Sequence, residues 1–254
     1  MFLTSVVGCK INLGLHVVRK RPDGYHDIET VFYPIDNFKD KITIAPSEQA
    51  VAFRCEGMVV PALPENNLCV KAFRLLERDY GISGVEILLE KHIPMGAGLG
   101  GGSADAAYTL KLLKDFFQLP IKQEQLRHYA LQLGSDVPFF LENKPVYATG
   151  RGELMTSISL DLSPYRIEVV HPDVFVSTDE AYQGVTPRQP KHSIVALLSQ
   201  PVSTWRHLLV NDFEERVFAK HPQLAAAKEN LYAQGALYAA MSGSGSALFG
   251  IFKK

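Results

Sequence analysis

A run of glycines in the first half of the chain is the feature of this sequence that most directly suggests chemistry. Residues 94–110 read PMGAGLGGGSADAAYTL and place five glycines within seven positions, directly before a stretch of helix formers. A glycine in place of alanine costs roughly 0.4 to 1 kcal/mol through the entropy of the unfolded chain, so the run costs about 2 to 5 kcal/mol. Because a folded protein is stable by only about 5 to 15 kcal/mol, we expect a reason other than packing.

The elements around the glycine run indicate what it holds. A strand over residues 85–93 leads through Pro94 into the run, and a helix is predicted from Ser103, a natural N-cap. This order leaves backbone N–H groups unshielded at the positive end of a helix dipole. Glycines also let the backbone approach an anion closely. The arrangement therefore predicts a phosphate-binding loop.

Two common phosphate loops fit the run poorly. Gly96, Gly98 and Gly101 satisfy the G-x-G-x-x-G pattern of dinucleotide-binding folds, but no alternation of strand, helix and strand precedes them. A P-loop requires a Gly-Lys pair after the run, which this sequence lacks. A flexible glycine hinge without a ligand is a further alternative, which the well-formed helix behind the run disfavours.

The remaining pattern predicts an α+β protein with a boundary near Gly152. A turn is expected at Pro22-Asp23-Gly24, because proline presets φ and glycine accepts a positive φ. The helix at 67–79 is expected to stop at Gly81. Other strands are expected at 5–18 with a bend at Gly14, 26–35, 40–46, 51–55, 146–150, 166–171, 236–241 and 246–252, and other helices at 123–133, 178–183, 192–199, 205–219 and 223–234.

Composition excludes several classes of function. Lys plus Arg number 26 and Asp plus Glu 27, so the net charge of −1 provides no field for nucleic acid or an anionic membrane. The first residues carry no basic targeting segment, and no apolar run reaches the length of a membrane span. Cys9, Cys55 and Cys69 are odd in number and lack metal-binding spacing, which favours free thiols. We expect a cytoplasmic protein, with monomer and dimer both open.

The glycine run resembles the ATP-binding motif of the GHMP kinases, the superfamily named for galactokinase, homoserine kinase, mevalonate kinase and phosphomevalonate kinase. The resemblance extends to GCKINLGLHVVRKRPDGYHDIETVF near the N-terminus, to the central GSDVPFF and to the late MSGSGSALFG. It implies a ribosomal-protein-like α+β domain for ATP over residues 1–152 and a ferredoxin-like α+β substrate domain over 153–254. It also implies an active site between the domains, with ATP as co-substrate and Mg²⁺.

The resemblance assigns roles to single residues. The matching aspartate, Asp136, takes the proton of the acceptor hydroxyl, and the matching lysine, Lys10, keeps it ionised and neutralises the transferring group. From its neighbours alone, Asp136 is more typical of a turn or cap. Ser103 is also a candidate ligand of Mg²⁺, whereas no carboxylate can be assigned to the metal. The implied ATP site comprises Pro94, Gly96, Gly98, Leu99, Gly100, Gly101, Gly102, Ser103 and Ala104, with Asn67, Leu68 and Lys91 beside the adenine.

The same resemblance implies an acceptor that carries a cytidine diphosphate group. His26 would bind the cytosine edge, and Tyr25 and Tyr182 would sandwich the ring, where stacking is worth about 1 to 3 kcal/mol per base. Without the resemblance, a Tyr-His pair packed in the core would be the favoured interpretation. The reaction implied is phosphorylation of the 2-hydroxyl of the methylerythritol part, in the non-mevalonate route to isoprenoid precursors. The other implied substrate contacts are Asn12, Thr178, Gly243, Ser244 and Gly245.

Some positions depart from the family pattern. Cys9 and Ser135 stand where alanine is usual, and Ser244 stands where threonine is usual; all three changes replace one small residue with another.

Two other functions stay open. Another GHMP kinase, acting on mevalonate or homoserine, is the first alternative. A nucleic-acid-binding module without catalytic activity is the second, which the lack of a basic stripe disfavours.

Overall fold

The computed structural model describes residues 2–58 and 63–254 and confirms the expected α+β class. The chain packs into two compact units that interleave along the sequence. The first unit combines Met1–Cys9, Phe38–Met95 and Gly100–Asn143, and the second combines Lys10–Asn37, Gly96–Leu99 and Lys144–Lys254. The glycine run therefore passes from the second unit into the first at Gly100.

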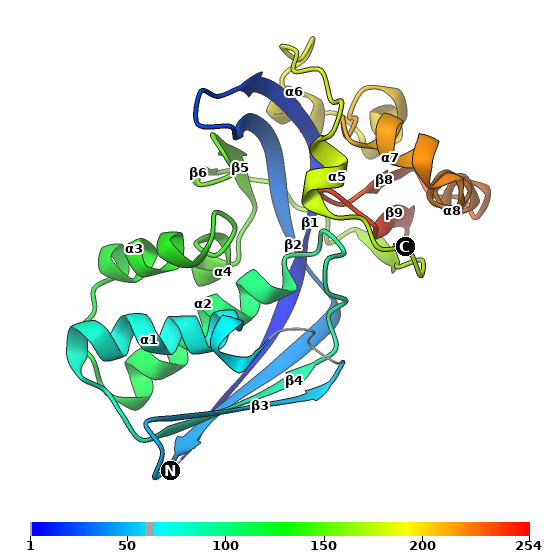
Figure 1. Cartoon of the computed structure of the whole chain (residues 1–254). Coiled ribbons are helices and arrows are strands. Elements are labelled where there is room, and N and C mark those ends of the chain that lie inside the picture. Colours follow the sequence, from blue (N-terminus) through cyan, green and yellow to red (C-terminus); the bar gives the residue numbers. More distant parts are fainter. Residues whose placement is uncertain (1, 59–62) are drawn as a thin grey trace. The chain divides into compact units, whose positions relative to one another are not determined.

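The first unit is a twisted sheet with helices on one face (Figure 1). Its strands are β3 (Val51–Gly57), parallel to β4 (Val85–Lys91), and the second part of β2 (His26–Pro46), antiparallel to β4. Every second residue of β4 is buried, which is the pattern of a sheet covered on one side. The helices and the short 3₁₀ turn are η1 (Pro64–Asn66), α1 (Leu68–Tyr80), α2 (Gly101–Phe116), α3 (Gln123–Leu133) and α4 (Phe139–Glu142).

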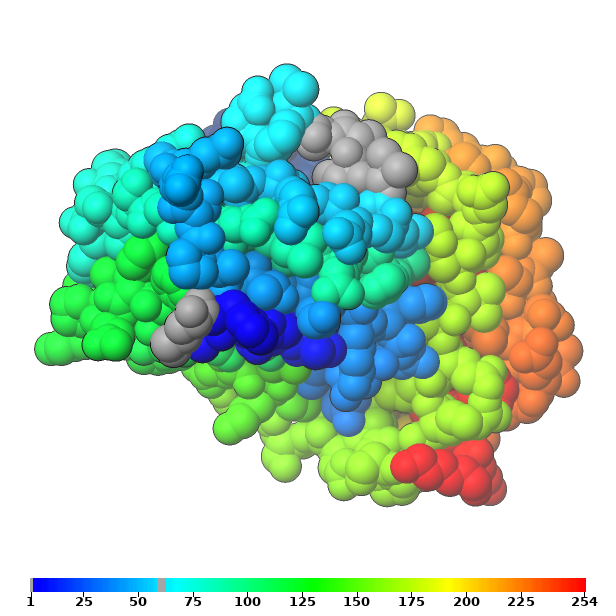
Figure 2. Space-filling view, turned by 90° about the horizontal axis from the view of Figure 1, so that it is seen from below, coloured from blue at the N-terminus to red at the C-terminus, as the bar shows by residue number. Residues whose placement is uncertain are grey.

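The first strand of the chain, β1 (Leu3–Lys20), pairs with β2. Val6 is 56% exposed while Val7 is fully buried, because successive side chains of a strand point to opposite faces. Figure 2 shows the dark blue start of β1 uncovered at the surface. The expected strand over 5–18 is thus present and longer at both ends.

The second unit contains two sets of strands. The first part of β2 pairs antiparallel with β5 (Val146–Thr149), which pairs with β6 (Leu154–Ser157). A separate antiparallel sheet has the order β7-β9-β8. The elements that complete this unit are β7 (Tyr165–Val170), α5 (Thr178–Tyr182), α6 (Ile194–Leu198), η2 (Val202–His207), α7 (Glu214–Lys220), α8 (Pro222–Ala233), β8 (Tyr238–Met241) and β9 (Leu248–Lys253).

The core of the second unit joins the start of the chain to its end. Leu15 and Val17 of β1 and Ile28 of β2 belong to one buried cluster with residues of the last third of the sequence. The later members of this cluster include Val176, Phe213, Val217, Leu224, Leu231, Met241 and Leu248. Folding of this unit therefore requires contacts between residues that are far apart in sequence.

Two expected element boundaries are wrong. The strands expected at 26–35 and 40–46 form one strand, β2, because the polar residues between them find partners while extended. Asn37 donates a hydrogen bond to the Ile167 carbonyl at 2.8 Å, and the buried Asp40 accepts hydrogen bonds from the backbone N–H groups of His92 and Ile93. Such side-chain bonds hold residues that would otherwise favour a turn.

The helix expected over 205–219 is interrupted. The 3₁₀ helix η2 ends at His207 and α7 begins at Glu214. Between them, Asn211 forms a β-bridge with Leu15 and donates to the carbonyls of Met241 and Gly243, both at 2.8 Å. These long-range hydrogen bonds hold Asn211 in an extended conformation, although the local sequence pattern favours a helix.

Helix α1 differs by one residue at each end from the expected range 67–79, and the predicted stop at Gly81 is confirmed. The Asn67 side chain caps the helix by accepting from the Cys69 N–H, and Gly81 ends it in the left-handed region at φ 64°. Cys9 and Cys69 are buried and Cys55 is half-buried, and within the described residues none of the three forms a disulfide. Among the helices of the described residues, none combines the length and apolar character needed to cross a bilayer.

Candidate active site

The first part of the glycine run is fixed by hydrogen bonds to its carbonyl groups. The Gly98 carbonyl accepts from Lys10 Nζ at 2.8 Å and from Ser242 Oγ at 2.9 Å. The Leu99 carbonyl accepts from the Lys10 N–H at 2.9 Å. Gly98 has a φ of +73°, and a Cβ on it would lie 1.9 Å from the Ser242 carbonyl oxygen. Only glycine fits this position.

The buried side chains of Lys10 and Asn12 form a connected network beneath this loop. Lys10 is 3% exposed, and its Nζ donates to Asn12 Oδ1 at 2.5 Å. Asn12 Nδ2 donates to Thr30 Oγ1 at 2.9 Å, and that hydroxyl donates to the Gly14 carbonyl at 2.6 Å. Because the Thr30 proton is used on Gly14, the hydroxyl must accept from Asn12. The amide orientation is thereby set, with its oxygen toward Lys10.

The loop after β8 completes the same cluster. Ser242 Oγ accepts from the Asn12 N–H at 3.3 Å, and the Ala247 N–H donates to the Ala97 carbonyl at 3.2 Å. Gly243 is buried, with the site of a Cβ 3.3 Å from Asn12 Oδ1. The structure therefore brings Lys10, Asn12, Gly98 and Gly243 together, as the resemblance implies. Gly245 is buried in the same loop, and Ser244 is half-buried. Sequence reasoning missed Ser242, although it precedes the quoted Gly-Ser-Gly directly.

The second part of the run starts a helix earlier than expected. Gly100 is the N-cap of α2 with φ 73°, and Ser103 is the third helical residue, so the prediction of Ser103 as N-cap is wrong. The first helical residue, Gly101, packs tightly, since a Cβ there would lie 2.7 Å from Ile93 Cγ2. No described side chain caps α2. The first intrahelical bond joins the Ala104 N–H to the Gly100 carbonyl, so the amide groups before Ala104 lie at the helix N-terminus, where anions are commonly bound.

A buried ion cluster lies under the start of α2. Lys91 Nζ donates to Asp105 Oδ2 at 2.7 Å and also to Asp40 Oδ2, and all three side chains are at most 4% exposed. Burial raises the pKa of Asp105 to about 7, against the opposing effect of Lys91. Burial also opposes the charge on Lys91, but Asp105 and Asp40 more than offset this effect and raise its pKa. Sequence reasoning missed this cluster, although the alternation of β4 places Lys91 in the buried register.

The other predicted site residues lie at the start of α1, where adenine is expected, and in the turn after α3, where the catalytic base is expected. Asn67 caps α1, and Leu68 is its first residue. Leu68 Cδ1 lies 3.8 Å from where a Cβ on Gly102 would be, so Leu68 borders the glycine run. Asp136 is half-buried, and its carbonyl accepts from the Phe139 N–H at 3.3 Å in the turn before α4. The roles of these residues stay predictions, as does that of Lys91 beside adenine.

The aromatic residues expected at the nucleobase are partly in contact. The His26 ring stacks on Tyr182 with centroids 4.8 Å apart, and Tyr182 meets Phe213 edge-on at 4.7 Å. Burial, helped by the charge of Lys20, lowers the pKa of His26, which favours the neutral imidazole. Tyr25 is 57% exposed, and the Arg151 guanidinium lies 4.9 Å from its ring centroid. Thr178, the first residue of α5, is also exposed.

The described residues offer few protein ligands for a metal ion. Across residues 2–58 and 63–254, no group of three His, Cys, Asp or Glu side chains is arranged to hold a metal. Mg²⁺ in kinases is bound by one or two protein groups together with substrate phosphates and water. The half-buried Ser103 hydroxyl in the first turn of α2 suits such a Mg²⁺ site.

Comparisons with known proteins agree with this geometry. The sequence model described as "GHMP kinases N terminal domain" matches residues 67–144, and "GHMP kinases C terminal" matches residues 193–254. The two matches fall on either side of Gly152, and the boundary itself stays a prediction.

Two curated relatives match over nearly the whole chain. A protein of Parabacteroides distasonis is 51% identical over 245 residues, and one of Bacteroides thetaiotaomicron is 48% identical over 247 residues. Both alignments cover 96% of this chain and 90% of the relative, and both relatives are named 4-diphosphocytidyl-2-C-methyl-D-erythritol kinase.

Solved structures give the same result. A crystal structure of 4-(cytidine 5'-diphospho)-2C-methyl-D-erythritol kinase superposes with a TM-score of 0.85 at 34% identity, covering 98% of this chain and 90% of the other. The mevalonate kinase of Methanococcus jannaschii has a TM-score of 0.72 at 13% identity, covering 100% and 91%, which shows the shared fold alone. The expected GHMP kinase fold is thereby confirmed. The chain therefore belongs to the GHMP kinases, a superfamily of ATP-dependent small-molecule kinases, and within it to the family of these curated relatives.

Proposed function

We propose that this protein transfers the γ-phosphoryl group of ATP to the 2-hydroxyl of 4-diphosphocytidyl-2-C-methyl-D-erythritol, in the cytoplasm, where both nucleotides are supplied. The observation that carries the proposal is the match to kinases of that name, which covers 96% of the chain with 48% and 51% sequence identity. The glycine run supports the proposal as well. Hydrogen bonds hold the Gly98 carbonyl in place, and no described side chain caps the start of α2, so the backbone N–H groups there suit the phosphates of a nucleotide triphosphate.

The ATP phosphates are expected at the backbone N–H groups of the glycine run. The helix dipole of α2 and its uncapped first turn favour negative charge there. Pro94, Gly96 and Leu99 are proposed to contact the nucleotide at the start of this loop, and Ala104 lies in the first turns of α2. Ser103 is proposed as the protein's ligand to the Mg²⁺ that accompanies ATP. The adenine is proposed to lie against Asn67, Leu68 and Lys91.

Lys10 and Asp136 are proposed as the catalytic residues. Asp136 accepts the proton of the acceptor hydroxyl, and Lys10 stabilises negative charge on the transferring phosphoryl group. The hydrogen bond from Lys10 Nζ to the Gly98 carbonyl supports this role, because it holds the ammonium against the glycine run, and a further bond to Asn12 Oδ1 orients it. General-base assistance supplies about 10² to 10⁴ in rate, and positioning with electrostatics supplies the rest.

The acceptor is proposed to be held by its cytosine and by small residues near the reacting hydroxyl. A neutral His26 has one donor and one acceptor nitrogen, which suits the mixed hydrogen-bonding edge of cytosine. Tyr25 and Tyr182 offer ring faces for stacking, and Thr178 lies in the same helix as Tyr182. Asn12, Gly243, Ser244 and Gly245 are proposed to lie near the erythritol part.

The decisive experiment is incubation of the purified protein with ATP, Mg²⁺ and the cytidylyl acceptor while ADP is measured. Turnover with this acceptor, and none with mevalonate or homoserine, is expected. Turnover with another alcohol alone would move the chain to a different GHMP kinase family. Asp136→Asn is expected to lower kcat at least roughly 100-fold with the ATP affinity little changed, as for the loss of a general base. Near-normal turnover of that variant would remove Asp136 from the mechanism.

A further inference from the structure

An exposed tyrosine at the turn between β1 and β2 is held more firmly than its exposure suggests. Tyr25 is 57% exposed, and its backbone is bonded on both sides. Its carbonyl accepts from the Arg21 N–H at 2.8 Å, and its N–H donates to Asp23 Oδ1 at 3.1 Å. The Gly24 N–H also donates to the Arg21 carbonyl at 3.2 Å, which closes the turn. The backbone beneath the ring is therefore fixed.

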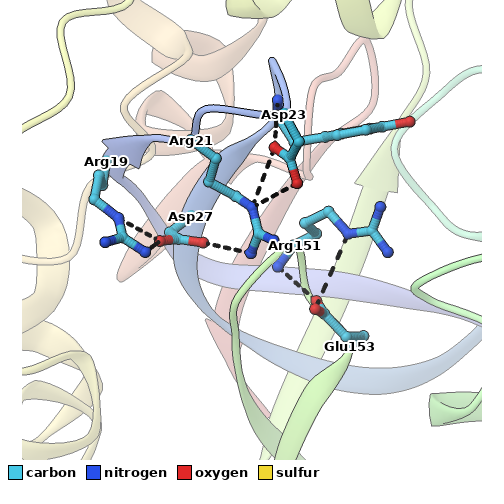
Figure 3. Close-up of polar contacts among 7 residues, drawn as sticks. Arg19, Arg21, Asp23, Asp27, Arg151 and Glu153 are labelled. Atoms are coloured by element: carbon cyan, nitrogen blue, oxygen red, sulfur yellow. Dashed lines mark hydrogen bonds and ion pairs between the residues drawn. The ribbon is translucent and has the colours of Figure 1, made fainter.

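Charged side chains brace the same turn (Figure 3). Arg21 Nε binds Asp23 Oδ2 at 3.0 Å, and Arg21 Nη1 binds Asp27 Oδ1 at 3.1 Å. Arg19 binds the other oxygen of Asp27 at 2.8 Å through Nε. The hydrogen bond from Arg19 and that from Arg21 lower the pKa of Asp27 despite its partial desolvation, so the brace stays charged at neutral pH. Arg21 thus joins the turn to the base of β2.

A third segment supplies the group that covers the Tyr25 ring. Arg151 follows β5, and its guanidinium lies 4.9 Å from the ring centroid, within the range of a cation–π contact. Glu153 orients Arg151: one carboxylate oxygen accepts from the Arg151 N–H at 2.5 Å, and the other lies 4.0 Å from its Nε (Figure 3). The Ile28 N–H donates to the Gly150 carbonyl at 2.7 Å, which ties this loop to β2.

We propose that Arg151 is a positioning residue for the pyrimidine base, covering one face of Tyr25 so that the opposite face is held ready for stacking. The inference rests on the proposed function, since the base belongs to the acceptor. A tyrosine at a solvent-exposed turn would otherwise pay the side-chain entropy of ordering when the base binds. Because the Tyr25 ring is already packed on a planar guanidinium before the base binds, it has less side-chain entropy left to lose on binding. Lysine would keep the charge but lose the planar contact.

The test measures binding of CMP by calorimetry together with steady-state kinetics. Arg151→Ala is expected to weaken CMP binding and raise the acceptor KM about two- to fivefold, as for an exposed cation–π contact. The KM for ATP and the kcat at saturating acceptor should change less than twofold. Arg151→Lys should recover part of the loss. Tyr25→Ala should weaken CMP binding at least roughly fivefold, as for the loss of one stacked base.

The double variant and a matched control decide the outcome. If Arg151 acts through Tyr25, adding Arg151→Ala to Tyr25→Ala should produce no further loss of CMP affinity. Arg206→Ala is the control, since Arg206 also lies over a tyrosine ring, 4.0 Å from the centroid of Tyr232, and should leave CMP affinity and acceptor KM unchanged. Equal CMP affinity of Arg151→Ala and the wild type, or full additivity in the double variant, would overturn the inference. Wild-type protein that binds no CMP would instead count against the proposed acceptor.

Discussion

Gly98 and Gly102, from the two parts of the glycine run, differ in what requires a glycine. In the first part, Gly98 is fixed by the fold, because its positive φ and its contact with the Ser242 carbonyl leave no room for a side chain. In the second part, Gly102 is exposed within α2, and the nearest atom to a Cβ there would be Leu68 Cδ1 at 3.8 Å. The fold therefore requires a glycine at position 98 but not at position 102.

The supports of the two parts differ as well. The Gly98 carbonyl receives hydrogen bonds from Lys10 and Ser242, and a network of uncharged amides and hydroxyls continues behind them. The start of α2 instead rests on the ion cluster of Lys91, Asp40 and Asp105. A glycine that the helix does not need, such as Gly102, indicates a position that a ligand approaches. Substitutions can separate these two reasons for a glycine.

The largest effect is expected at Gly98. Gly98→Ala forces a side chain into the left-handed region and against a backbone oxygen, and these two costs together amount to about 2 to 5 kcal/mol of stability. Urea unfolding monitored by circular dichroism measures the loss. Gly24→Ala, at a positive φ with nothing within 4 Å of the added Cβ, is the control for the dihedral alone and should lose less. Equal losses would mean that the contact with Ser242 does not matter.

Asp105 is expected to make stability depend on pH. With a folded pKa of about 7, well above that of an unfolded aspartate, the folded protein keeps a proton that the unfolded chain releases between about pH 4 and 7. Wild-type stability should therefore fall as pH rises through this window and level off above it. Asp105→Asn should remove this slope. Asp115→Asn, exposed on the same helix, should preserve it. Parallel pH profiles of Asp105→Asn and wild type would contradict the assignment.

Gly102→Ala is expected to move stability and ATP affinity in opposite directions. Alanine is the better helix former by up to about 1 kcal/mol, so the melting temperature should rise. The added methyl group would stand where ATP phosphates approach the helix amides, so the KM for ATP should rise at least roughly tenfold, about 1.4 kcal/mol. Thermal unfolding without nucleotide and initial rates at varied ATP provide both values. A stabilised variant with unchanged KM would remove Gly102 from the phosphate site.

The smallest effect on stability is expected at Asn67, where the cap and the proposed adenine contact can be separated. Asn67→Ser retains a side-chain oxygen for the Cys69 N–H, so the free energy of unfolding should change by only a few tenths of a kcal/mol. Asn67→Ala removes the cap and should cost about 1 kcal/mol. If the amide contacts adenine, both variants should raise the KM for ATP. A normal KM in Asn67→Ser would limit Asn67 to capping α1.

Local chemistry in the sequence was sufficient to predict the elements around the loop. Strand β4, the glycine run and the Gly81 stop each depend on residues within a few positions of one another. The N-cap of α2 was misplaced by three residues, at Ser103 instead of Gly100, because glycine disfavours helices in isolation. The close packing of Gly101 on Ile93 comes from tertiary structure and has no local signal.

Long-range contacts account for what the sequence did not reveal. Asn211 interrupts the expected helix because its amide binds the carbonyls of Met241 and Gly243, thirty and more residues away. The partners of Lys91 were equally hidden, since Asp40 and Asp105 are ordinary aspartates in sequence. The site residues were identified from motif resemblance, which encodes the spatial arrangement that periodicity cannot supply.

The core shared by Leu15, Val17 and Ile28 with the last third of the chain has a practical meaning for making fragments. A polypeptide expressed from residue 153 onward would keep Phe213, Leu231 and Leu248 but lose the strands that cover them. Its uncovered apolar surface should drive aggregation rather than autonomous folding. Co-expression with a peptide carrying residues 10–37 offers a route to rescue it, as in fragment complementation.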